Sequence, residues 1–254
     1  MEGFVKFIGT GGARFVVASQ MRSTGGLWLN YRDTNLYIDP GPGALVRVRN
    51  GRGELEPAHL DGIILTHKHL DHSNDVNVMV EAMTEGGHRR RGVLFCPEDA
   101  LGEEGVVLRY LRKYLERIEL LGEKGEYIIK DVVFSVPVRH VHPGEVYGMI
   151  FNLNKKIGLI ADTRFFEELP DFYPVDVLIV NVLRVQPIRE SDRIDHLSLA
   201  DVREIVSRIR PEVAIMTHFG MSMLKDDPEV LAKALQEETG VEVVAAYDEM
   251  IWRF

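Results

Sequence analysis

Short apolar runs bounded by turn residues alternate along the chain with segments in which apolar residues recur every three to four positions. Residues 61–66, Asp-Gly-Ile-Ile-Leu-Thr, form one such run and predict a buried strand. Residues 16–17, 27–29 and 35–39 predict early antiparallel strands, and Gly41-Pro42-Gly43 ends that group. Because strands and helices alternate without a low-complexity linker, the pattern predicts one α/β domain over residues 1–254.

Two predicted helices have clear start and stop signals. The first begins at Ser198, whose side chain can cap it together with Asp201, and Pro211 ends it. The second begins at Asp227-Pro228 and ends at Gly240. Each helix is expected to pack an apolar face on a sheet: Val202, Ile205, Val206 and Ile209 in the first, and Val230, Leu231, Ala234 and Leu235 in the second.

The segment after the 61–66 strand carries the most distinctive chemistry. His67, His69, Asp71 and His72 fall within six residues, although the whole chain has only nine histidines. Imidazole and carboxylate groups are the ligands that zinc and similar divalent ions accept. His67 and His69 can project together, while Asp71 and His72 can turn toward a second centre. A solvated polar loop is the alternative, but this spacing rarely arises by chance, so the pattern predicts a site for two metals.

The His-x-His-x-Asp-His motif after an apolar strand resembles the signature of the metallo-β-lactamase superfamily. The resemblance implies a four-layer αβ/βα metallo-β-lactamase sandwich and three further ligands: a His, a bridging acidic residue and a last His. Matching residues follow in that order at His142, Asp162 and His218, each in or after an apolar segment. His140 shares a strand face with His142, and the sequence leaves the choice between them open.

Two further segments resemble the phosphodiesterase branch of that superfamily, which includes tRNA 3′-processing endonucleases and the phosphoribosyl cyclic phosphodiesterase of phosphonate breakdown. They are Gly9-Thr-Gly-Gly12 and residues 195–201, Asp-His-Leu-Ser-Leu-Ala-Asp. The chain departs from both enzymes. Its single Cys96 cannot build the additional structural zinc site of the phosphonate-pathway enzyme, and it has no long Gly/Pro-rich arm like that of the tRNA-processing enzymes. The expected substrate is a small cyclic or nucleotide-type phosphodiester, with an RNA or DNA end as the nearest variant.

The resemblance also implies a division of roles. His67, His69 and His142 would hold one metal, and Asp71, His72 and His218 the other, with Asp162 bridging both. A hydroxide shared by the two metals would attack the phosphorus. Asp71 and His196 are the expected catalytic residues, with His196 near the phosphate or the leaving group. Zinc is the expected metal, and manganese and iron are alternatives because they accept the same ligands.

Several polar residues are candidates for supporting parts. Asp39 follows an apolar strand, where it could support the metal ligands, and Asp192 or Asp195 could orient His196. The polar loop 184–193 contains three arginines that could bind a phosphate, although a surface salt bridge is the simpler interpretation of each: Arg184, Arg189 and Arg193. A second basic group recurs at near-helical spacing and could form either a phosphate-facing lip or a solvated face: Arg109, Arg112, Lys113 and Arg117.

Composition limits the kinds of partner that the protein is expected to bind. The net charge of −9 argues against a protein that binds long nucleic acid over its whole surface. One cysteine, no signal peptide and no apolar span of membrane length predict a cytoplasmic protein without a membrane partner. The resemblance implies that a homodimer can form.

Three other functions compete with a phosphodiesterase. A lactone, thioester or β-lactam hydrolase would use the same fold, but the β-lactamases that place Cys in the second metal site have no match here. A binding protein on a decayed scaffold would be expected to have lost ligands, and the set here is complete. A di-iron redox protein would resemble His-x-Glu-x-Asp-His, whereas His69 occupies the Glu position.

Overall fold

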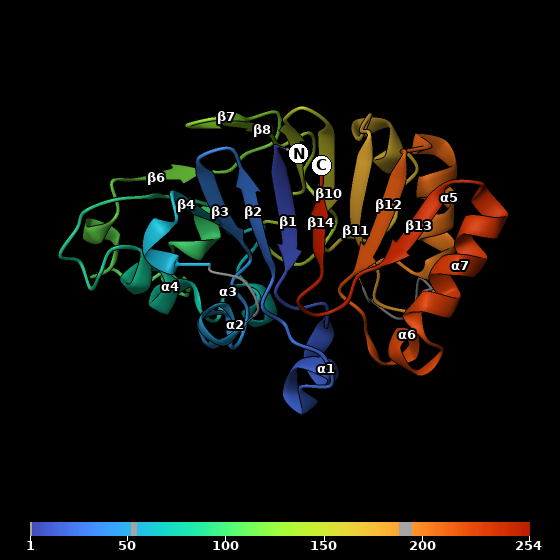
Figure 1. The fold of residues 1–254 in the computed structure, drawn as a ribbon, viewed down its shortest axis with the longest axis horizontal. Coiled ribbons are helices and arrows are strands. Elements are labelled where there is room, and N and C mark those ends of the chain that lie inside the picture. The colour runs from blue at the N-terminus through green and yellow to red at the C-terminus, as the bar shows by residue number, and fades with distance from the viewer. Residues whose placement is uncertain (1, 52–54, 188–194) are drawn as a thin grey trace.

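The computed structural model describes residues 2–51, 55–187 and 195–254. Two seven-stranded sheets lie face to face, with helices on their outer sides (Figure 1). The strands of the first sheet are β1 (Gly3–Phe7), β2 (Leu27–Tyr31), β3 (Thr34–Ile38), β4 (Gly62–Ile64), β5 (Val93–Cys96), β6 (Arg117–Leu120) and β14 (Ile251–Arg253). Those of the second are β7 (Glu126–Ile129), β8 (Val132–Ser135), β9 (Met149–Asn152), β10 (Lys156–Ile160), β11 (Val177–Asn181), β12 (Val213–Thr217) and β13 (Glu242–Ala245).

The helices divide between the two halves. Among the described residues, four helices occur in the part of the chain that supplies most strands of the first sheet: α1 (Ala13–Ser19), α2 (Ala44–Asn50), α3 (Leu70–Ser73) and α4 (Val76–Met83). Three further described helices occur in the part that supplies the second sheet: α5 (Leu199–Ile209), α6 (Met221–Lys225) and α7 (Pro228–Thr239). Short 3-10 turns cover Pro57–His59, Glu98–Ala100, Arg112–Tyr114 and Leu169–Phe172. In the described part of the chain, no helix has the length and apolar character needed to cross a membrane.

Each sheet combines antiparallel and parallel pairs. The first has the order β14-β1-β2-β3-β4-β5-β6, and its strands are parallel from β3 to β6. The second has the order β13-β12-β11-β10-β9-β8-β7, and its strands are parallel from β10 to β13. Parallel strands end at one edge of a sheet, so the loops that follow β3, β4, β10, β11 and β12 can build a common site.

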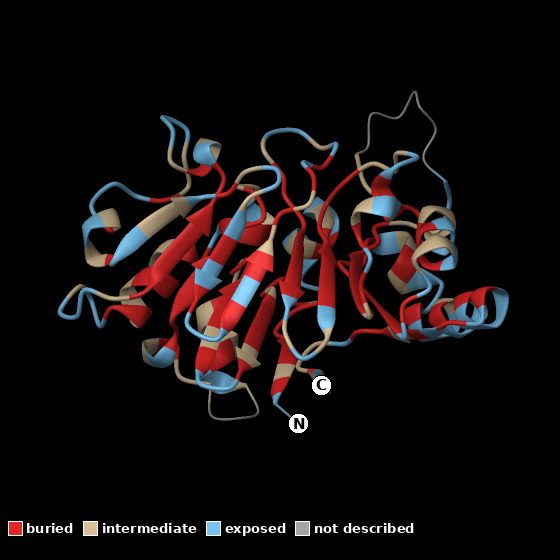
Figure 2. Cartoon of the chain, turned by 90° about the horizontal axis from the view of Figure 1, so that it is seen from above, coloured by how far each residue is buried: buried red, intermediate tan, exposed pale blue. Residues whose placement is uncertain are grey.

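Three apolar clusters separate the four layers, and Figure 2 shows the buried residues running along the strands. One lies between the sheets, where the Phe95 and Phe134 rings meet at a centroid distance of 5.1 Å. A second packs Met79 of α4 against the first sheet. The third packs Ile205 of α5 and Leu235 of α7 against the second sheet. The predicted αβ/βα sandwich is therefore confirmed.

The sequence-based strands at 27–29, 35–39 and 61–66 are confirmed as β2, β3 and β4. The strand expected at 16–17 is wrong, because these residues lie in α1. Val16 is buried there, whereas the preceding Phe15 is exposed. Two β-branched residues are too few to impose an extended backbone when a helix buries one of them.

The first predicted helix has the expected ends and face, including the reciprocal cap between Ser198 and Asp201. The face expected for the second is partly wrong, because Val230 and Ala234 of α7 are exposed. The buried stripe instead starts at the first residue of the helix and advances by three or four residues: Pro228, Ala232, Leu235 and Thr239. Pro228 and Thr239 were left out of the apolar pattern, which rotated the predicted face.

The basic group at 109–117 does not form a helix face. Its residues lie in turns, in the 3-10 turn Arg112–Tyr114 and in β6. Arg112 donates hydrogen bonds to the carbonyl oxygens of Leu101 and Val107, and Arg117 pairs with Glu119. These contacts engage both guanidinium groups locally, so neither supports the phosphate-facing lip, which was one of the two alternatives for this basic group.

Candidate metal centre

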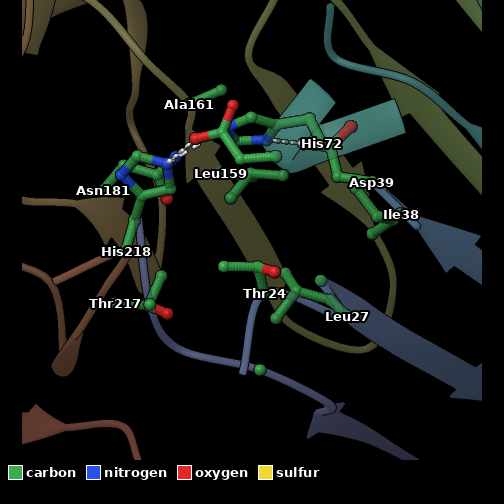
Figure 3. Close-up of a pocket in the computed structure, with 14 residues that line it drawn as sticks. Thr24, Leu27, Ile38, Asp39, His72, Leu159, Ala161, Asn181, Thr217 and His218 are labelled. Carbon is green, nitrogen blue, oxygen red and sulfur yellow. Dashed lines mark hydrogen bonds and ion pairs between the residues drawn. The ribbon is translucent and has the colours of Figure 1, made fainter. Parts of the chain in front are cut away.

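The polar cluster lies where strands of both sheets end. His67 follows β4 in the first sheet, while Asp162 and His218 follow β10 and β12 in the second. His142 comes from the connection between β8 and β9, and His196 from the segment before α5. Figure 3 shows His72 and His218 at a pocket also lined by Asn181 and Thr217, which places ligands from both halves at one site.

Two groups of donor atoms with no residue in common meet there, and a third group, formed by His142, Asp162 and His196, overlaps both. The first comprises His67, His69 and His142, and His142 Nε2 lies 3.2 Å from His69 Nδ1. Within each group, the donor atoms all lie within 4.8 Å of one another. The structure thus brings together the three residues predicted to hold the first metal, although His69 and His142 are 73 positions apart in sequence.

The second group joins both halves of the chain: Asp71, His72, Asp162 and His218. His72 Nε2 lies 3.0 Å from His218 Nε2, and His218 Nε2 lies 3.5 Å from Asp71 Oδ2. The backbone amide of Ala13 donates to Asp71 Oδ2 at 3.3 Å, which orients this carboxylate.

Asp162 lies between the two groups. Its Oδ2 is 3.7 Å from His67 Nε2 in the first group and 3.4 Å from His72 Nε2 in the second. Its Oδ1 is 3.5 Å from His218 Nε2 and accepts a hydrogen bond from Asn181 Nδ2 at 2.9 Å. This central position is the one that a carboxylate shared by two metals would need.

The choice between His140 and His142 follows from their contacts. His142 belongs to the first group, whereas His140 Nε2 and the Tyr173 hydroxyl form a buried hydrogen bond of 2.7 Å. His140 is in none of the ligand groups found among the described residues. Burial lowers the pKa of His140 to about 4, so the ring is neutral at physiological pH.

Asp39 supports the cluster, as expected, by accepting hydrogen bonds from Thr66 and His72. Its Oδ1 accepts the backbone amide of Thr66 at 2.7 Å, and its Oδ2 accepts the Thr66 hydroxyl at 2.6 Å and His72 Nδ1 at 2.9 Å. With Nδ1 engaged, His72 turns Nε2 toward the cluster. Asp39 and His218 both have left-handed backbone (φ 54° and 62°), and such strain in non-glycine residues gathers at functional sites.

Two supporting residues were missed by the sequence reasoning. Thr66 carries a hydroxyl that lies between Asp39 and His67 Nδ1, at 3.0 Å from the latter. Asn181 ends the apolar strand β11 and holds Asp162. A polar residue at the end of a buried parallel strand is a usable signal, and the same rule that selected His67 would have found Asn181.

His196 lies close to the shared carboxylate. Its Nδ1 is 3.5 Å from Asp162 Oδ2, and its ring packs against that of His142 at a centroid distance of 4.8 Å. Of the two candidates for orienting this ring, Asp195 has its carboxylate paired with Arg164 at 2.7 Å. The Asp195 carbonyl oxygen instead accepts from His142 Nδ1 at 2.7 Å. The other residues expected in this loop lie outside the described residues: Arg189, Asp192 and Arg193.

Burial and charge set the protonation of the cluster. Burial is the main cause that lowers the pKa of His67 well below its usual value, and it also lowers the pKa of His69. At His72 burial opposes the charged form, but the carboxylates of Asp162, Asp71 and Asp39 together raise its pKa. Burial lowers the pKa of His196 to about 4. A metal ion binds neutral imidazole, so an ion held by His72 would displace the proton that the neighbouring carboxylates favour on its ring.

The donor set suits divalent cations. Two ligands at about 2.0–2.2 Å from one tetrahedral ion lie about 3.3–3.6 Å apart, close to the separations observed here. Buried His67 Nε2 faces Asp162 and has no hydrogen-bond partner among the described residues, an arrangement that a cation would complete. Gly12 packs tightly against the cluster, since a Cβ atom there would lie 2.2 Å from His218 Nδ1.

Comparison with known proteins agrees with this architecture. The family described as the beta-lactamase superfamily domain matches residues 34–219. The uncharacterized protein MJ1374 of Methanocaldococcus jannaschii is 31% identical over 251 residues, which cover 94% of this chain and 91% of that protein.

Three solved structures share the fold. The metallo-beta-lactamase fold protein YhfI from Bacillus subtilis is 20% identical with a TM-score of 0.82, and 99% of each chain is covered. A diphosphatase from the PhnP family is 19% identical with a TM-score of 0.72, over 100% of this chain and 98% of that one. The short form of human tRNase Z is 16% identical with a TM-score of 0.70, over 98% of each. The chain belongs to the metallo-β-lactamase superfamily.

Proposed function

We propose that the protein is a dinuclear metal-dependent phosphodiesterase acting on a small cyclic or nucleotide-type phosphodiester. Members of the superfamily are metal-dependent hydrolases. The observation that carries the proposal is the position of Asp162 Oδ2, within 4.0 Å of imidazole nitrogens from both ligand groups. One carboxylate oxygen between two complete sets favours a pair of ions over a single ion.

The ligand roles follow from the two groups. His67, His69 and His142 would hold one ion, and the second ion would be held by Asp71, His72 and His218, with Asp162 shared. Two divalent ions at this site would supply Lewis acidity and a nucleophile at neutral pH. Zinc fits this donor set, and manganese and iron remain alternatives.

The chain itself supplies the orientation of these groups. Asp39 holds the proton on His72 Nδ1, so that Nε2 offers its lone pair to the cluster. The Asp195 carbonyl does the same for His142, and the pair between Arg164 and Asp195 fixes that segment next to His196. The ligands are thereby held before any substrate arrives, which reduces the reorganisation that the reaction requires.

His196 is proposed to contact the substrate. Its side chain is 18% exposed, whereas that of Asp162 beside it is 1% exposed, so the ring is accessible from outside. An imidazole N–H at this position can donate to a phosphate oxygen or to the departing oxygen as negative charge develops there. Because His142, Asp162 and His196 also form a ligand group, metal content has to be measured together with turnover.

A phosphate substrate is favoured over a carboxyl derivative. Two of the structures that share the fold are named as a diphosphatase and a tRNase, and both act on phosphorus–oxygen bonds. A small substrate is favoured over long RNA or DNA because a net charge of −9 opposes binding of a polyanion over a broad surface. A nucleic-acid end is the second candidate, since it presents the same phosphodiester to the cluster.

The test is hydrolysis of bis(p-nitrophenyl) phosphate by protein reconstituted with zinc or manganese, with Asp162→Ala as the paired variant. The expected result is turnover by the wild type and loss of both metal and turnover in the variant. Turnover that persists in Asp162→Ala would refute the role of the shared carboxylate. Hydrolysis of lactones or thioesters by metal-loaded protein that leaves every phosphodiester intact would refute the proposed substrate class.

A further inference from the structure

A second pocket, of about 400 Å³, opens beside the metal centre between α1 and α6. Three segments far apart in sequence line it: Ala13, Phe15 and Val16; Leu183, Arg184 and Gln186; Gly220, Met221 and Ser222. In Figure 1, α1 and α6 lie at the same end of the molecule as α3, which carries Asp71 and His72. Sites for small molecules commonly enclose about 300–1,000 Å³, so the pocket has room for a substrate group.

Each lining segment is joined directly to the metal centre. The Ala13 amide donates to Asp71 Oδ2, and Gly220 lies two residues after His218. The Leu183 amide donates to the carbonyl oxygen of Leu197, the residue after His196, at 3.1 Å. The pocket therefore adjoins the segments that carry the ligands, so a substrate whose phosphate lies at the cluster can place its remaining part there.

The lining combines an apolar face with planar polar groups. The Phe15 side chain is 79% exposed and that of Met221 is 46% exposed, although both are large and apolar. Exposed aromatic and methionine side chains beside a cavity provide a surface on which a flat ring can stack. Arg184 and Gln186 also line the pocket, and their side chains end in planar hydrogen-bonding groups.

We propose that this pocket is a subsite for the nucleobase of a nucleotide-type phosphodiester, which stacks on Phe15 and Met221 while Gln186 and Arg184 contact its polar edge. An aliphatic group would form no hydrogen bonds with Arg184 and Gln186, and an inorganic anion would form no apolar contacts with Phe15 and Met221. The inference rests on the proposed function for the position of the phosphate, but binding of the base is a separate property of the pocket.

The first measurement is binding without chemistry. Saturation-transfer NMR compares adenosine with 1-O-methylribose, which lacks the base, on wild-type protein and on Phe15→Ala. The substitution removes an exposed side chain, so the protein is expected to fold. Stacking on an aromatic side chain contributes about 1–3 kcal/mol per base, so adenosine should bind the variant about 5-fold to 150-fold more weakly.

The second measurement uses two substrates that differ only in the base. These are adenosine 2′,3′-cyclic phosphate and 1-O-methylribose 2,3-cyclic phosphate, followed by phosphorus NMR with metal-loaded protein. The ratio of kcat/KM for the two should favour the nucleotide by about 10-fold or more and should fall toward 1 in Phe15→Ala and in Gln186→Ala. Ile128→Ala is the matched control, because Ile128 is also exposed and apolar but lies on β7 outside the pocket.

The outcomes separate the two proposals. Adenosine binding that is weakened by Phe15→Ala but not by Ile128→Ala supports the subsite, even if no phosphodiester is hydrolysed; in that case the phosphodiesterase proposal alone fails. Equal hydrolysis of the two cyclic phosphates, or adenosine binding that Phe15→Ala leaves unchanged, overturns the subsite and leaves the phosphodiesterase proposal standing.

Discussion

The carboxylate of Asp39 is expected to control metal affinity without touching the metal. It accepts three hydrogen bonds, from the Thr66 amide, the Thr66 hydroxyl and His72 Nδ1. In Asp39→Asn one of the two oxygens becomes an amide donor. If the amide group faces Thr66, the buried backbone N–H loses its acceptor, since that N–H cannot rotate away. If it faces His72, two donors meet.

The second arrangement would force His72 into the other tautomer. The proton would then lie on Nε2, the nitrogen that faces Asp162 and His218, and His72 could no longer bind a cation there. Losing one buried hydrogen bond to a charged group costs about 1.5–3 kcal/mol. We therefore expect zinc affinity to fall by roughly 10-fold to 100-fold. The same loss of affinity is usual when a residue that hydrogen-bonds to a metal ligand is replaced.

The assay is a zinc titration of purified protein against a chromophoric chelator of known affinity. Asp61→Asn is the matched control, because Asp61 is also 7% exposed and bonded to backbone but lies at the opposite ends of the strands, where it pairs with Lys130. Both variants lose one buried carboxylate charge, but only Asp39→Asn should weaken zinc binding. Equal zinc affinity in Asp39→Asn and in wild type would refute the argument from the His72 tautomer.

Three further outcomes are expected. His196→Ala should retain two metals by elemental analysis and lose at least about 100-fold in kcat, because its ring contributes a proton donor and not an essential ligand; loss of a metal would contradict this division. Ser198→Ala should lower the free energy of unfolding by about 1 kcal/mol in urea, since it removes the reciprocal cap of α5; an unchanged midpoint would contradict it. Removing metal with a chelator should lower Tm by roughly 5–10 °C in calorimetry, and re-addition of zinc should restore it.

The histidine-rich segment 67–72 could be assigned from sequence, but the later ligands could not. His67, His69, Asp71 and His72 are close in sequence, so their spacing alone predicted that they lie together. The later ligands were placed by resemblance to a family and not by physics. Spacing could not decide between His140 and His142, because both lie in one segment. The Tyr173 hydroxyl, 33 residues further along the chain, engages His140 and leaves His142 for the cluster.

The same limit appears where local pattern and packing disagree. Residues 16–17 have strand propensity but form part of α1, and the buried face of α7 includes Pro228 and Thr239, which an apolar pattern omits. Asp195 was one of two candidates for orienting His196, yet its carboxylate pairs with Arg164. Arg164 lies 31 residues from Asp195, and propensity contains no information about such a partner.

The sequence by itself determined the alternation of strands and helices, the cap of α5, and a metal-ligand motif at the end of β4, because these depend on residues within a few positions of each other. Resemblance to a family implied the central position of Asp162, which the tertiary structure explains by the convergence of strand ends. Only the tertiary structure decided that Thr66 and Asn181 support the ligand groups and that a second pocket adjoins the centre. These features arise where strand ends from two sheets converge, and that convergence is a property of the packed sheets rather than of any one segment.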